Sequence, residues 1–372
     1  MDKHLHIISH DIPWPADYGG VFDLFHKIRW LHHLGVRIHL HCFYKDRKPA
    51  PELNAFCEEV FYYPRRTGIK GFSLTLPYIV SSRKNEQLKA RITANDYPVL
   101  MEGIHCTWLM HEGVLHNRKT IVRLHNVECN YYDRLAAHES NFFKKVYFNI
   151  ESRLLKNYER TIAKKTLFVA VSEEDKTWYQ KNLGANAAFL PVFLPWEEVK
   201  QSTERGCFCL YHGNLSVNEN EKVADWLMNE VFDTLDIPLI IAGKKPSLPL
   251  QSLAHSRPHT CITCSPSENE MSDLIRKAHV HILPSFNQTG VKLKLLNALF
   301  NGRHCIVNRA AVNGSGAEAL CHVAENANDF KAAVKALYEM PFSEADIQER
   351  KHVLSQYYDN EKNARQLIAW LY

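Results

Sequence analysis

Two lysines and an asparagine lie near the start of a predicted helix in the segment TGVKLKLLNALFNG (289–302). Lys292 and Lys294 fall in the first turn, where free backbone N–H groups and the helix dipole favour an anion. Asn297, three residues after Lys294, shares its face and can both donate and accept hydrogen bonds. The pattern predicts a site for a phosphate-bearing ligand with hydroxyl groups. A core helix with solvated lysines remains the alternative.

Paired glycines open another predicted helix. Gly19 and Gly20 follow the first predicted strand (4–10) and begin the helical pattern of 19–35. Because they lack side chains, a ligand could approach the backbone N–H groups at the helix start. A tight turn without any ligand explains the same pair, so both interpretations stay open.

Polar residues end two further predicted strands. His125 and Asn126 come at the end of one, and Gly213 and Asn214 at the end of the other. Ligand groups gather at the carboxyl ends of parallel strands. A histidine there can bind a hydroxyl or phosphate or transfer a proton, although a structural turn histidine is the alternative.

Three glutamates are candidates by charge alone. Glu128 follows His125 closely, whereas Glu151 and Glu159 fall on a long predicted helix (141–165). We expect Glu151 and Glu159 to be solvated or ion-paired, because carboxylates are rarely buried without a partner. No carboxylate is placed as a nucleophile.

The ten cysteines do not predict a metal site. Cys207 and Cys209 form one near-pair, and Cys261 and Cys264 form a lone CxxC beside His259. A zinc site needs a second ligand pair at suitable spacing, and none is evident. We therefore expect thiols in strands and no metal.

Strands and helices alternate along most of the chain, which is typical of a parallel, doubly wound sheet. The predicted strands cover 4–10, 36–43, 60–64, 98–104, 119–125 and 166–172, then 207–214, 238–243, 259–264, 279–285 and 304–308. Prolines, charges and turn residues interrupt the alternation at 191–206, as an interdomain connection would.

The fold class predicted from this pattern is α/β, with two Rossmann-like domains in tandem facing a cleft. We expect the domains to cover 1–192 and 193–345, with a helix over 346–372 that packs back onto the first domain. Neither half has GxGxxG after its first strand, which disfavours a nicotinamide enzyme. In tandem sheets of this kind, ligands bind beyond the carboxyl ends of the strands.

Composition is that of a soluble globular protein, with 23% charged and 45% hydrophobic residues. The net charge of +4 is too small to suggest a nucleic-acid-binding protein. The amino-terminal MDKHLHIISH has no apolar core of a signal peptide, and no run approaches the roughly 20 apolar residues of a membrane span. We expect a cytoplasmic protein, with the inner membrane face as a compatible location.

The chain resembles the GT-B glycosyltransferases of the large retaining family four, also called glycosyl transferases group 1. The resemblance covers nearly the whole chain and rests on the order and spacing of six segments: ADYGGVFDLFHKIRWLHHLGVRIHLHCF, LHNVECNYYDRLA, VAVSEEDKTWYQ, YHGNLSVNENEKVADWLM, LIIAGKKP and PSFNQTGVKLKLLNALFNGRHCIVN. It implies a nucleotide-diphosphate-sugar donor, held mainly by the second domain, and an acceptor glycan or lipid-linked glycan, held mainly by the first.

The resemblance also implies roles for individual residues. His125 and Lys294 would be catalytic. The acceptor side would include Glu102, His105 and Asn126. The donor would be bound by Gly19, Gly20, Gly213, Asn214, Thr289, Gly290, Val291, Lys292, Leu293 and Asn297.

One departure from the family pattern concerns two glutamates, eight residues apart, that many relatives carry. The corresponding positions here are Thr289 and Asn297. Asn214 likewise lacks the positive charge common at its position. Asn297 can still bind a hydroxyl, although a neutral hydrogen bond is weaker than a charged one.

The resemblance implies a retaining transfer that needs neither a metal nor a cofactor, with the leaving phosphate taking the acceptor's proton. Two alternatives stay open on the same architecture: a non-hydrolysing nucleotide-sugar epimerase, and a non-catalytic protein that binds nucleotide sugars or glycans. The segment YPRRTGIKGF (63–72) places basic residues beside aromatics, a pattern compatible with peripheral contact with anionic lipid. A solvated surface loop explains that segment as well.

Overall fold

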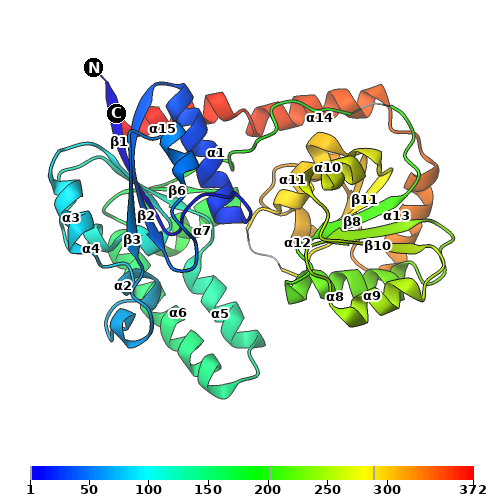
Figure 1. The fold of residues 1–372 in the computed structure, drawn as a ribbon, viewed down its shortest axis with the longest axis horizontal. Coiled ribbons are helices and arrows are strands. Elements are labelled where there is room, and N and C mark those ends of the chain that lie inside the picture. The colour runs from blue at the N-terminus through cyan, green and yellow to red at the C-terminus, as the bar shows by residue number, and fades with distance from the viewer. Residues whose placement is uncertain (1, 202, 288–289) are drawn as a thin grey trace. The chain divides into compact units, whose positions relative to one another are not determined.

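The computed structural model describes residues 2–201, 203–287 and 290–372. The chain divides into two compact units (Figure 1): unit 1 comprises Met1–Pro195 and Tyr358–Tyr372, and unit 2 comprises Trp196–Tyr357. Each unit is a parallel sheet with helices on both faces, which confirms the predicted fold class of two Rossmann-like domains in tandem.

Unit 1 contains a seven-stranded sheet in the order β3-β2-β1-β4-β5-β6-β7, and neighbouring strands are parallel throughout. The strands are β1 (Lys3–Ser9), β2 (Val36–Tyr44), β3 (Glu59–Pro64), β4 (Val99–Glu102), β5 (Thr120–Leu124), β6 (Leu167–Ala170) and β7 (Ala187–Phe189). The strand order reverses between β1 and β4, so the carboxyl ends of these two strands flank the position where such sheets bind ligands.

Helices cover both faces of this sheet. The helices of unit 1 are α1 (Gly19–His33), α2 (Tyr78–Ser81), α3 (Glu86–Thr93), α4 (Trp108–His111), α5 (Glu128–His138), α6 (Phe142–Ile162), α7 (Glu173–Leu183) and α15 (Asn360–Leu371), with short 3₁₀ turns η1 (Pro51–Ala55), η2 (Gly68–Gly71) and η3 (Ile104–Cys106). Leu24, Ile28 and Leu31 of α1 pack with Leu367 and Leu371 of α15 in one core cluster. A second cluster joins α3, α4, α6 and α7 to the opposite face.

The C-terminal region differs from the single helix expected over 346–372. It contains two helices, α14 (Glu344–Tyr357), which belongs to unit 2, and α15, which belongs to unit 1. Asp359 begins α15 by accepting a hydrogen bond from the backbone N–H of Lys362. A side-chain cap of this kind starts a new helix, and the chain leaves one unit for the other at this break.

Unit 2 contains a six-stranded parallel sheet in the order β10-β9-β8-β11-β12-β13. The strands are β8 (Cys209–Gly213), β9 (Leu239–Gly243), β10 (Thr260–Cys264), β11 (Val280–Ile282), β12 (His304–Val307) and β13 (His322–Val323). The order reverses between β8 and β11, so the ligand position predicted by topology lies beyond the ends of these two strands.

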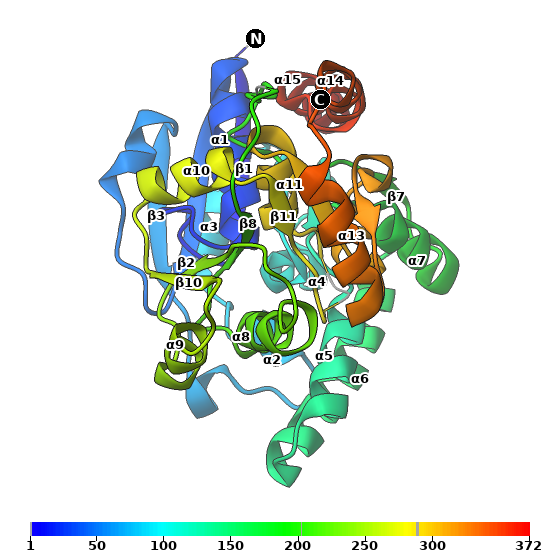
Figure 2. The same cartoon turned by 90° about the vertical axis from the view of Figure 1, so that its right-hand side faces the viewer.

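The helices of unit 2 are α8 (Asn218–Trp226), continued by the π-turn η4 (Leu227–Val231), α9 (Leu248–His255), α10 (Glu268–Lys277), α11 (Leu293–Asn301), α12 (Arg309–Val312), α13 (Ala327–Glu339) and α14, with one 3₁₀ turn, η5 (Glu318–Leu320). Figure 2 shows α8, α9 and α13 on one side of the sheet, and α10 and α11 on the other. Across the described residues, no helix is both long enough and apolar enough to cross a membrane.

Candidate active site

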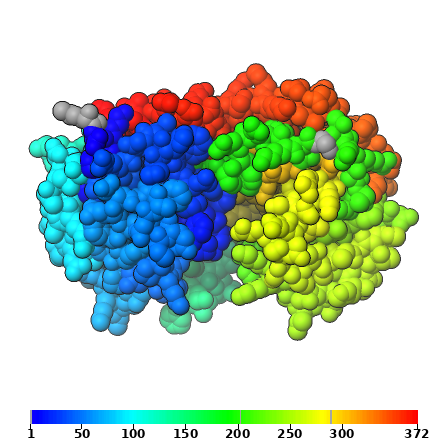
Figure 3. Space-filling view, turned by 45° about the horizontal axis from the view of Figure 1, so that its top comes forward, coloured from blue at the N-terminus to red at the C-terminus, as the bar shows by residue number. Residues whose placement is uncertain are grey.

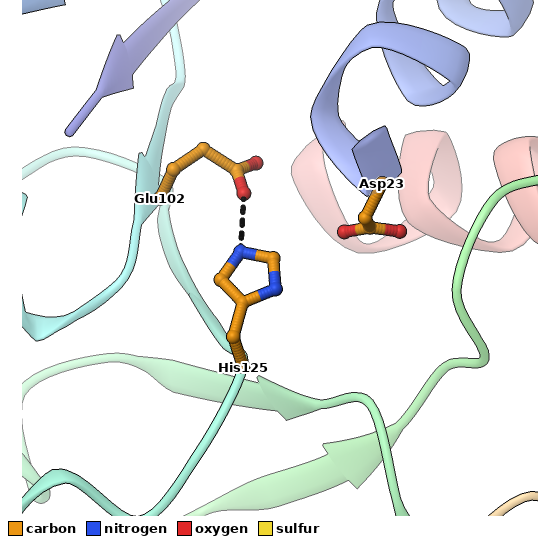
Figure 4. A group of neighbouring side chains, drawn as sticks. All are labelled: Asp23, Glu102 and His125. Carbon is orange, nitrogen blue, oxygen red and sulfur yellow. Dashed lines mark hydrogen bonds and ion pairs between the residues drawn. The ribbon is translucent and has the colours of Figure 1, made fainter. Parts of the chain in front are cut away.

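Three polar side chains meet at the carboxyl ends of β1, β4 and β5 in unit 1. His10 follows β1, Glu102 ends β4 and His125 follows β5. His125 Nε2 lies 3.1 Å from Glu102 Oε2, and the ring centroids of His125 and His10 are 6.1 Å apart. Figure 4 shows one nitrogen of the His125 ring facing the carboxylate of Glu102, with the carboxylate of Asp23, from α1, to the side of this pair. The parallel strand ends therefore bring together two of the predicted residues, His125 and Glu102.

A buried lysine fixes the carboxylate that contacts His125. Lys27 Nζ lies 2.7 Å from Glu102 Oε1 and 3.0 Å from Asp23 Oδ2, and all three side chains are fully buried. Burial alone would raise the pKa of Glu102, but attraction to Lys27 and the hydrogen bond with His125 lower it below its ordinary value. Glu102 is therefore an ionised acceptor that keeps a proton on His125 Nε2 and orients the ring.

Arg123 completes this charge network from the adjacent strand. Its guanidinium contacts Asp23 at 3.1 and 3.2 Å and also donates to the carbonyl oxygens of Leu190 and Pro191. Asp23 Oδ1 accepts a further hydrogen bond from the backbone N–H of Phe193 at 2.8 Å. Burial would raise the pKa of Asp23, but Arg123 and Lys27 hold it well below its ordinary value.

Asp23, Glu102 and His125 are also close enough to be considered as metal ligands, because their ligand atoms lie within 4.8 Å of one another. Lys27 and Arg123 nevertheless contact the same carboxylates, so a metal ion would face two positive charges at short range. The chemistry of the cluster therefore fits an internally neutralised network better than a metal centre.

His105 and Asn126 lie at the margin of this cluster. The ring centroids of His105 and His10 are 5.4 Å apart, and Arg83 donates to the His10 carbonyl oxygen at 3.0 Å. Burial lowers the pKa of His10 to about 3 and that of His105 well below its ordinary value, so both rings are neutral at pH 7. Asn126 follows His125 and is partly exposed.

The two glycines at the start of α1 differ in what surrounds them. A Cβ on Gly20 would come within 3.0 Å of the His10 ring, so packing alone explains that glycine. A Cβ on Gly19 would meet nothing within 4 Å. Nothing inside the described chain therefore requires glycine at position 19, and a ligand-binding role for Gly19 stays a prediction.

A Gly19→Ala variant should keep wild-type thermal stability but lose about tenfold or more in donor or acceptor affinity. The added methyl group has open space in the free protein and would clash only with a bound ligand, whose displacement costs on the order of 1–2 kcal/mol. Melting temperature and ligand titration test this on the same preparation. Unchanged affinity at wild-type stability would remove Gly19 from the site.

Glu128, Glu151 and Glu159 are all buried, so the expectation that the last two are solvated or ion-paired is wrong. Glu151 and Glu159 each have a structural task instead. Glu151 accepts a hydrogen bond from the backbone N–H of Tyr78 at 2.8 Å, and Glu159 accepts one from the Tyr179 hydroxyl at 3.1 Å. Burial raises the pKa of Glu159 to about 7. Burial, reinforced by Glu159, raises the pKa of Glu128 to about 8.

A Glu128→Gln variant should be more stable than wild type at pH 8 and nearly unchanged at pH 5. The folded pKa of about 8 lies above the ordinary value of 4.5, so wild type loses stability as pH rises from about 5 to 8. A neutral amide avoids this loss, with an expected gain of about 4 kcal/mol at pH 8. Urea denaturation at both pH values measures it, and the exposed Glu86→Gln serves as control. An equal gain at both pH values would contradict the role given to burial.

In unit 2, a partly buried lysine lies beside the end of β8. Lys294 Nζ lies 3.4 Å from both Tyr211 Oη and Asn220 Oδ1, and 4.7 Å from the centroid of the Tyr211 ring. Burial, followed by repulsion from Lys292, lowers the pKa of Lys294 to about 7. Within the described part of unit 2, no carboxylate pairs with this ammonium group. An anionic ligand would supply the missing countercharge.

Asn220 links Lys294 to the turn after β8. Asn220 Nδ2 donates to the carbonyl oxygen of Asn214 at 3.0 Å, and the carbonyl oxygen of Asn220 accepts from Tyr211 Oη at 2.9 Å. A Cβ on Gly213 would meet Asn220 only at an ordinary contact distance of 3.5 Å. The side-chain oxygen of Asn214 accepts from Ser216 N–H and Oγ, which gives this asparagine a turn-forming role. Gly213, Asn214 and Lys294 therefore belong to one neighbourhood.

The helix start predicted to bind phosphate is present. Helix α11 begins after Lys292, and no side chain accepts a hydrogen bond from its first turn within the described residues. Gly290 has φ of 67°, a conformation that glycine adopts without strain. Lys292 Nζ turns back to the Gly290 carbonyl oxygen at 3.0 Å. Thr289 lies outside the described residues.

The remaining predicted donor residues follow the same helix. Val291 and Leu293 are partly exposed on either side of Lys292. Asn297 is also partly exposed, one turn after Lys294, and its Oδ1 accepts a hydrogen bond from Asn301 Nδ2 at 3.0 Å. The asparagine that replaces a glutamate therefore already uses its acceptor oxygen within the helix.

Sequence reasoning missed Asp23, Lys27 and Arg123, which hold the His125 side of the site together. Two signals were present. Asp23 and Lys27 are four residues apart on the apolar face of a predicted helix, and Arg123 interrupts the apolar strand TIVRL. Charges at core-facing positions are rare unless they pair with one another.

Known proteins resemble this chain both in sequence and in fold. Residues 207–340 match the family model described as glycosyl transferases group 1. A 44.6 kDa uncharacterized protein of the cps region of Klebsiella pneumoniae is 28% identical over 331 residues, covering 83% of this chain and 84% of that protein.

Solved structures share the fold over the whole chain. Sucrose-phosphate synthase from Thermosynechococcus elongatus superposes with a TM-score of 0.71 at 11% identity, covering 99% of this chain and 98% of its own. HepE from Anabaena, solved with UDP and glucose, superposes with a TM-score of 0.63 at 11% identity, covering 99% of both chains. The chain therefore has the GT-B fold of these solved structures, and its residues 207–340 are similar to the glycosyl transferases group 1.

Proposed function

We propose that this glycosyltransferase moves a sugar from a nucleotide-diphosphate-sugar donor, with UDP-sugars as the first candidates, to a glycan or lipid-linked glycan acceptor. The observation that carries the proposal is Lys294. Its ammonium group is partly buried at the switch point of the unit 2 sheet, beside the open start of α11, without a carboxylate partner in the described residues. A diphosphate satisfies both the lysine and the helix N–H groups.

The comparisons support the choice of donor and acceptor classes. HepE, which shares the fold, was solved with UDP and glucose, and this makes UDP-sugars the first donors to examine. The Klebsiella protein belongs to the cps region, a polysaccharide-biosynthesis locus. A hydroxyl group on a growing surface polysaccharide is therefore the proposed acceptor.

The proposed reaction proceeds with retention and without a metal or cofactor. The bond between the anomeric carbon and the diphosphate oxygen breaks, and a new bond forms from the acceptor oxygen on the same face. The acceptor proton passes to the departing phosphate oxygen. Lys294 and the N–H groups at the start of α11 stabilise the developing charge on the diphosphate.

His125 is proposed to bind a hydroxyl group of the transferred sugar. Its Nε2 is occupied by Glu102, so Nδ1 is the ring atom available to a ligand. The tautomer set by Glu102 makes Nδ1 an acceptor when the ring is neutral. His125→Ala should therefore lower the transfer rate, and unchanged transfer would remove the histidine from the mechanism.

A thermal-shift screen against UDP-, GDP-, ADP- and TDP-sugars tests the donor class directly. A ligand that binds only the folded protein stabilises it and so raises its melting temperature. The stabilisation is about 2.7 kcal/mol when the ligand concentration is a hundred times the dissociation constant. We expect one nucleotide to stand out, followed by release of that nucleotide diphosphate when acceptor is added. The anomeric configuration of the product, read by NMR, tests retention.

The same assays separate the two alternatives. An epimerase would convert the donor to an isomer without an acceptor, and a binding-only protein would shift in melting temperature without turnover. None of the relatives reported above is named as either, and no observation in the chain favours one of them.

A further inference from the structure

Exposed apolar side chains are concentrated in two segments of unit 1. In the described part of the chain, fifteen large apolar side chains are exposed, and eight of them belong to residues 65–76 or to the first half of α6. The eight are Ile69, Phe72, Leu74, Phe142, Phe143, Val146, Tyr147 and Ile150. Ile69 is 94% exposed, Leu74 83% and Phe143 81%. A concentration of exposed apolar side chains points to an interaction site, whereas single exposed apolar residues do not.

The two segments are held together through Tyr78. Its backbone N–H donates to Glu151 of α6 at 2.8 Å, and its hydroxyl accepts from the backbone N–H of Gly68 at 3.1 Å. The Arg65 guanidinium lies 5.4 Å from the centroid of the Tyr78 ring. Both segments reach the same end of unit 1, as Figures 1 and 3 show. We call the eight apolar residues, with the basic residues around them, the basic-apolar face.

Hydrogen bonds fix the conformation of the loop formed by residues 65–76. Ser81 Oγ donates to the Gly71 carbonyl oxygen at 2.6 Å, and the backbone N–H of Arg66 donates to the Ser82 carbonyl oxygen at 2.9 Å. A Cβ on Gly71 would come within 2.5 Å of the Arg66 carbonyl oxygen. The fold therefore holds Ile69, and the residues beside it, outward at a cost in solvation.

The charge of the basic-apolar face has one sign. Every exposed charged residue of α6 is basic: Lys144, Lys145, Arg153, Lys156 and Arg160. Both carboxylates of α6, Glu151 and Glu159, are buried. Residues 60–85 contain no acidic residue, and they add Arg65, Arg66 and Lys70. Two carboxylates come from the neighbouring α5 and the residue that ends it: Asp133, which accepts from Ser152 Oγ, and Glu139, which accepts from the backbone N–H of Asn141.

We propose that the basic-apolar face docks the protein on an anionic lipid bilayer. Phenylalanine, tyrosine and isoleucine side chains on one helix face enter the boundary between headgroups and acyl chains, while lysine and arginine pair with anionic headgroups. Insertion of the apolar side chains and attraction of the basic side chains to anionic headgroups then both contribute to membrane binding. An acidic protein partner would match the charge equally but would not need the apolar loop tip at Ile69 and Leu74.

Vesicle co-sedimentation of the full chain tests the proposal without any donor or acceptor, so its failure is separate from failure of the proposed glycosyl transfer. We expect binding to phosphatidylcholine vesicles that contain phosphatidylglycerol and little binding to phosphatidylcholine alone. Phe142→Ser with Phe143→Ser, and separately Lys144→Glu with Lys145→Glu, should each weaken binding about tenfold or more. Added salt should weaken binding of the wild type further.

Matched changes in unit 2 serve as controls. Leu248→Ser with Met340→Ser removes exposed apolar side chains, and Lys335→Glu with Lys351→Glu reverses exposed charges. These should bind vesicles as wild type does. The proposal is overturned if wild type ignores anionic vesicles, or if the α6 variants bind as tightly as wild type. It is also overturned if the chain self-associates, loses that association in the phenylalanine variant and never binds vesicles.

Discussion

Replacing Lys294 with methionine should lower the rate of sugar transfer about 10²–10³-fold, because this lysine is proposed to stabilise the departing diphosphate. Methionine keeps the volume beside Tyr211 and removes the charge. Steady-state kinetics with the donor found in the screen provide the measurement. Lys335→Met, an exposed lysine of α13, is the control and should keep wild-type rates.

Donor affinity should also depend on pH through the same residue. The pKa of Lys294 in the free protein is lowered to about 7, and only the ammonium form pairs with a diphosphate. Affinity should therefore be greatest below pH 7 and fall by up to tenfold per unit as pH rises above it, until the raised pKa of the bound state is reached. Isothermal titration in two buffers of different ionisation enthalpy should detect proton uptake near pH 7. The donor affinity of the Lys294→Met variant should not change with pH in this range. If the affinity of wild type were equally independent of pH, the lysine would not contact the donor.

Replacing Asp23 with alanine should destabilise unit 1 by about 3–5 kcal/mol, as expected when one partner of a buried ion pair is removed. Asp23 accepts from Arg123, Lys27 and the backbone of Phe193, and none of these can reach water without rearrangement. Urea denaturation measures the change. His125 should lose its fixed orientation as well, because Lys27 would no longer be held between two carboxylates.

An exposed ion pair in the same unit provides the comparison. Glu361 and Arg365 lie one turn apart on α15, with both side chains about half exposed. Glu361→Ala should cost less than about 1 kcal/mol, as is usual for surface pairs. If the two alanine variants lost stability equally, the buried network would not be the source of the effect.

Much of the architecture was predictable because each level of the sequence indicates the same structure. The apolar run LHIIS is too short for a helix and is followed by helical spacing at Leu24, Ile28 and Leu31, which together specify one strand–helix unit. Repetition of that strand–helix unit favours a parallel sheet with helices packed on both faces. The glycines and polar residues at strand ends then fall at ligand-binding edges by topology alone.

The charge partners were not predictable in this way, because pairing across the core depends on residues far apart in the sequence. Asp23 and Arg123 are one hundred positions apart, and only the packing of α1 on β5 brings them within 3.1 Å. Glu159 likewise looks like a surface carboxylate on a long helix until Tyr179 is placed against it. Solvation of a charged side chain is a property of its tertiary surroundings, and local spacing does not report it.

Periodicity and turn chemistry are local properties, so the amino-acid sequence was enough to predict the two parallel sheets, the helix start after Gly290 and the positions of His125 and Lys294 at strand and helix ends. The tertiary structure alone decided which charges are buried together, that Lys294 lies over Tyr211 with a pKa near 7, and that α6 keeps its carboxylates inside and its phenylalanines outside. These outcomes depend on desolvation, which is set only when distant elements pack.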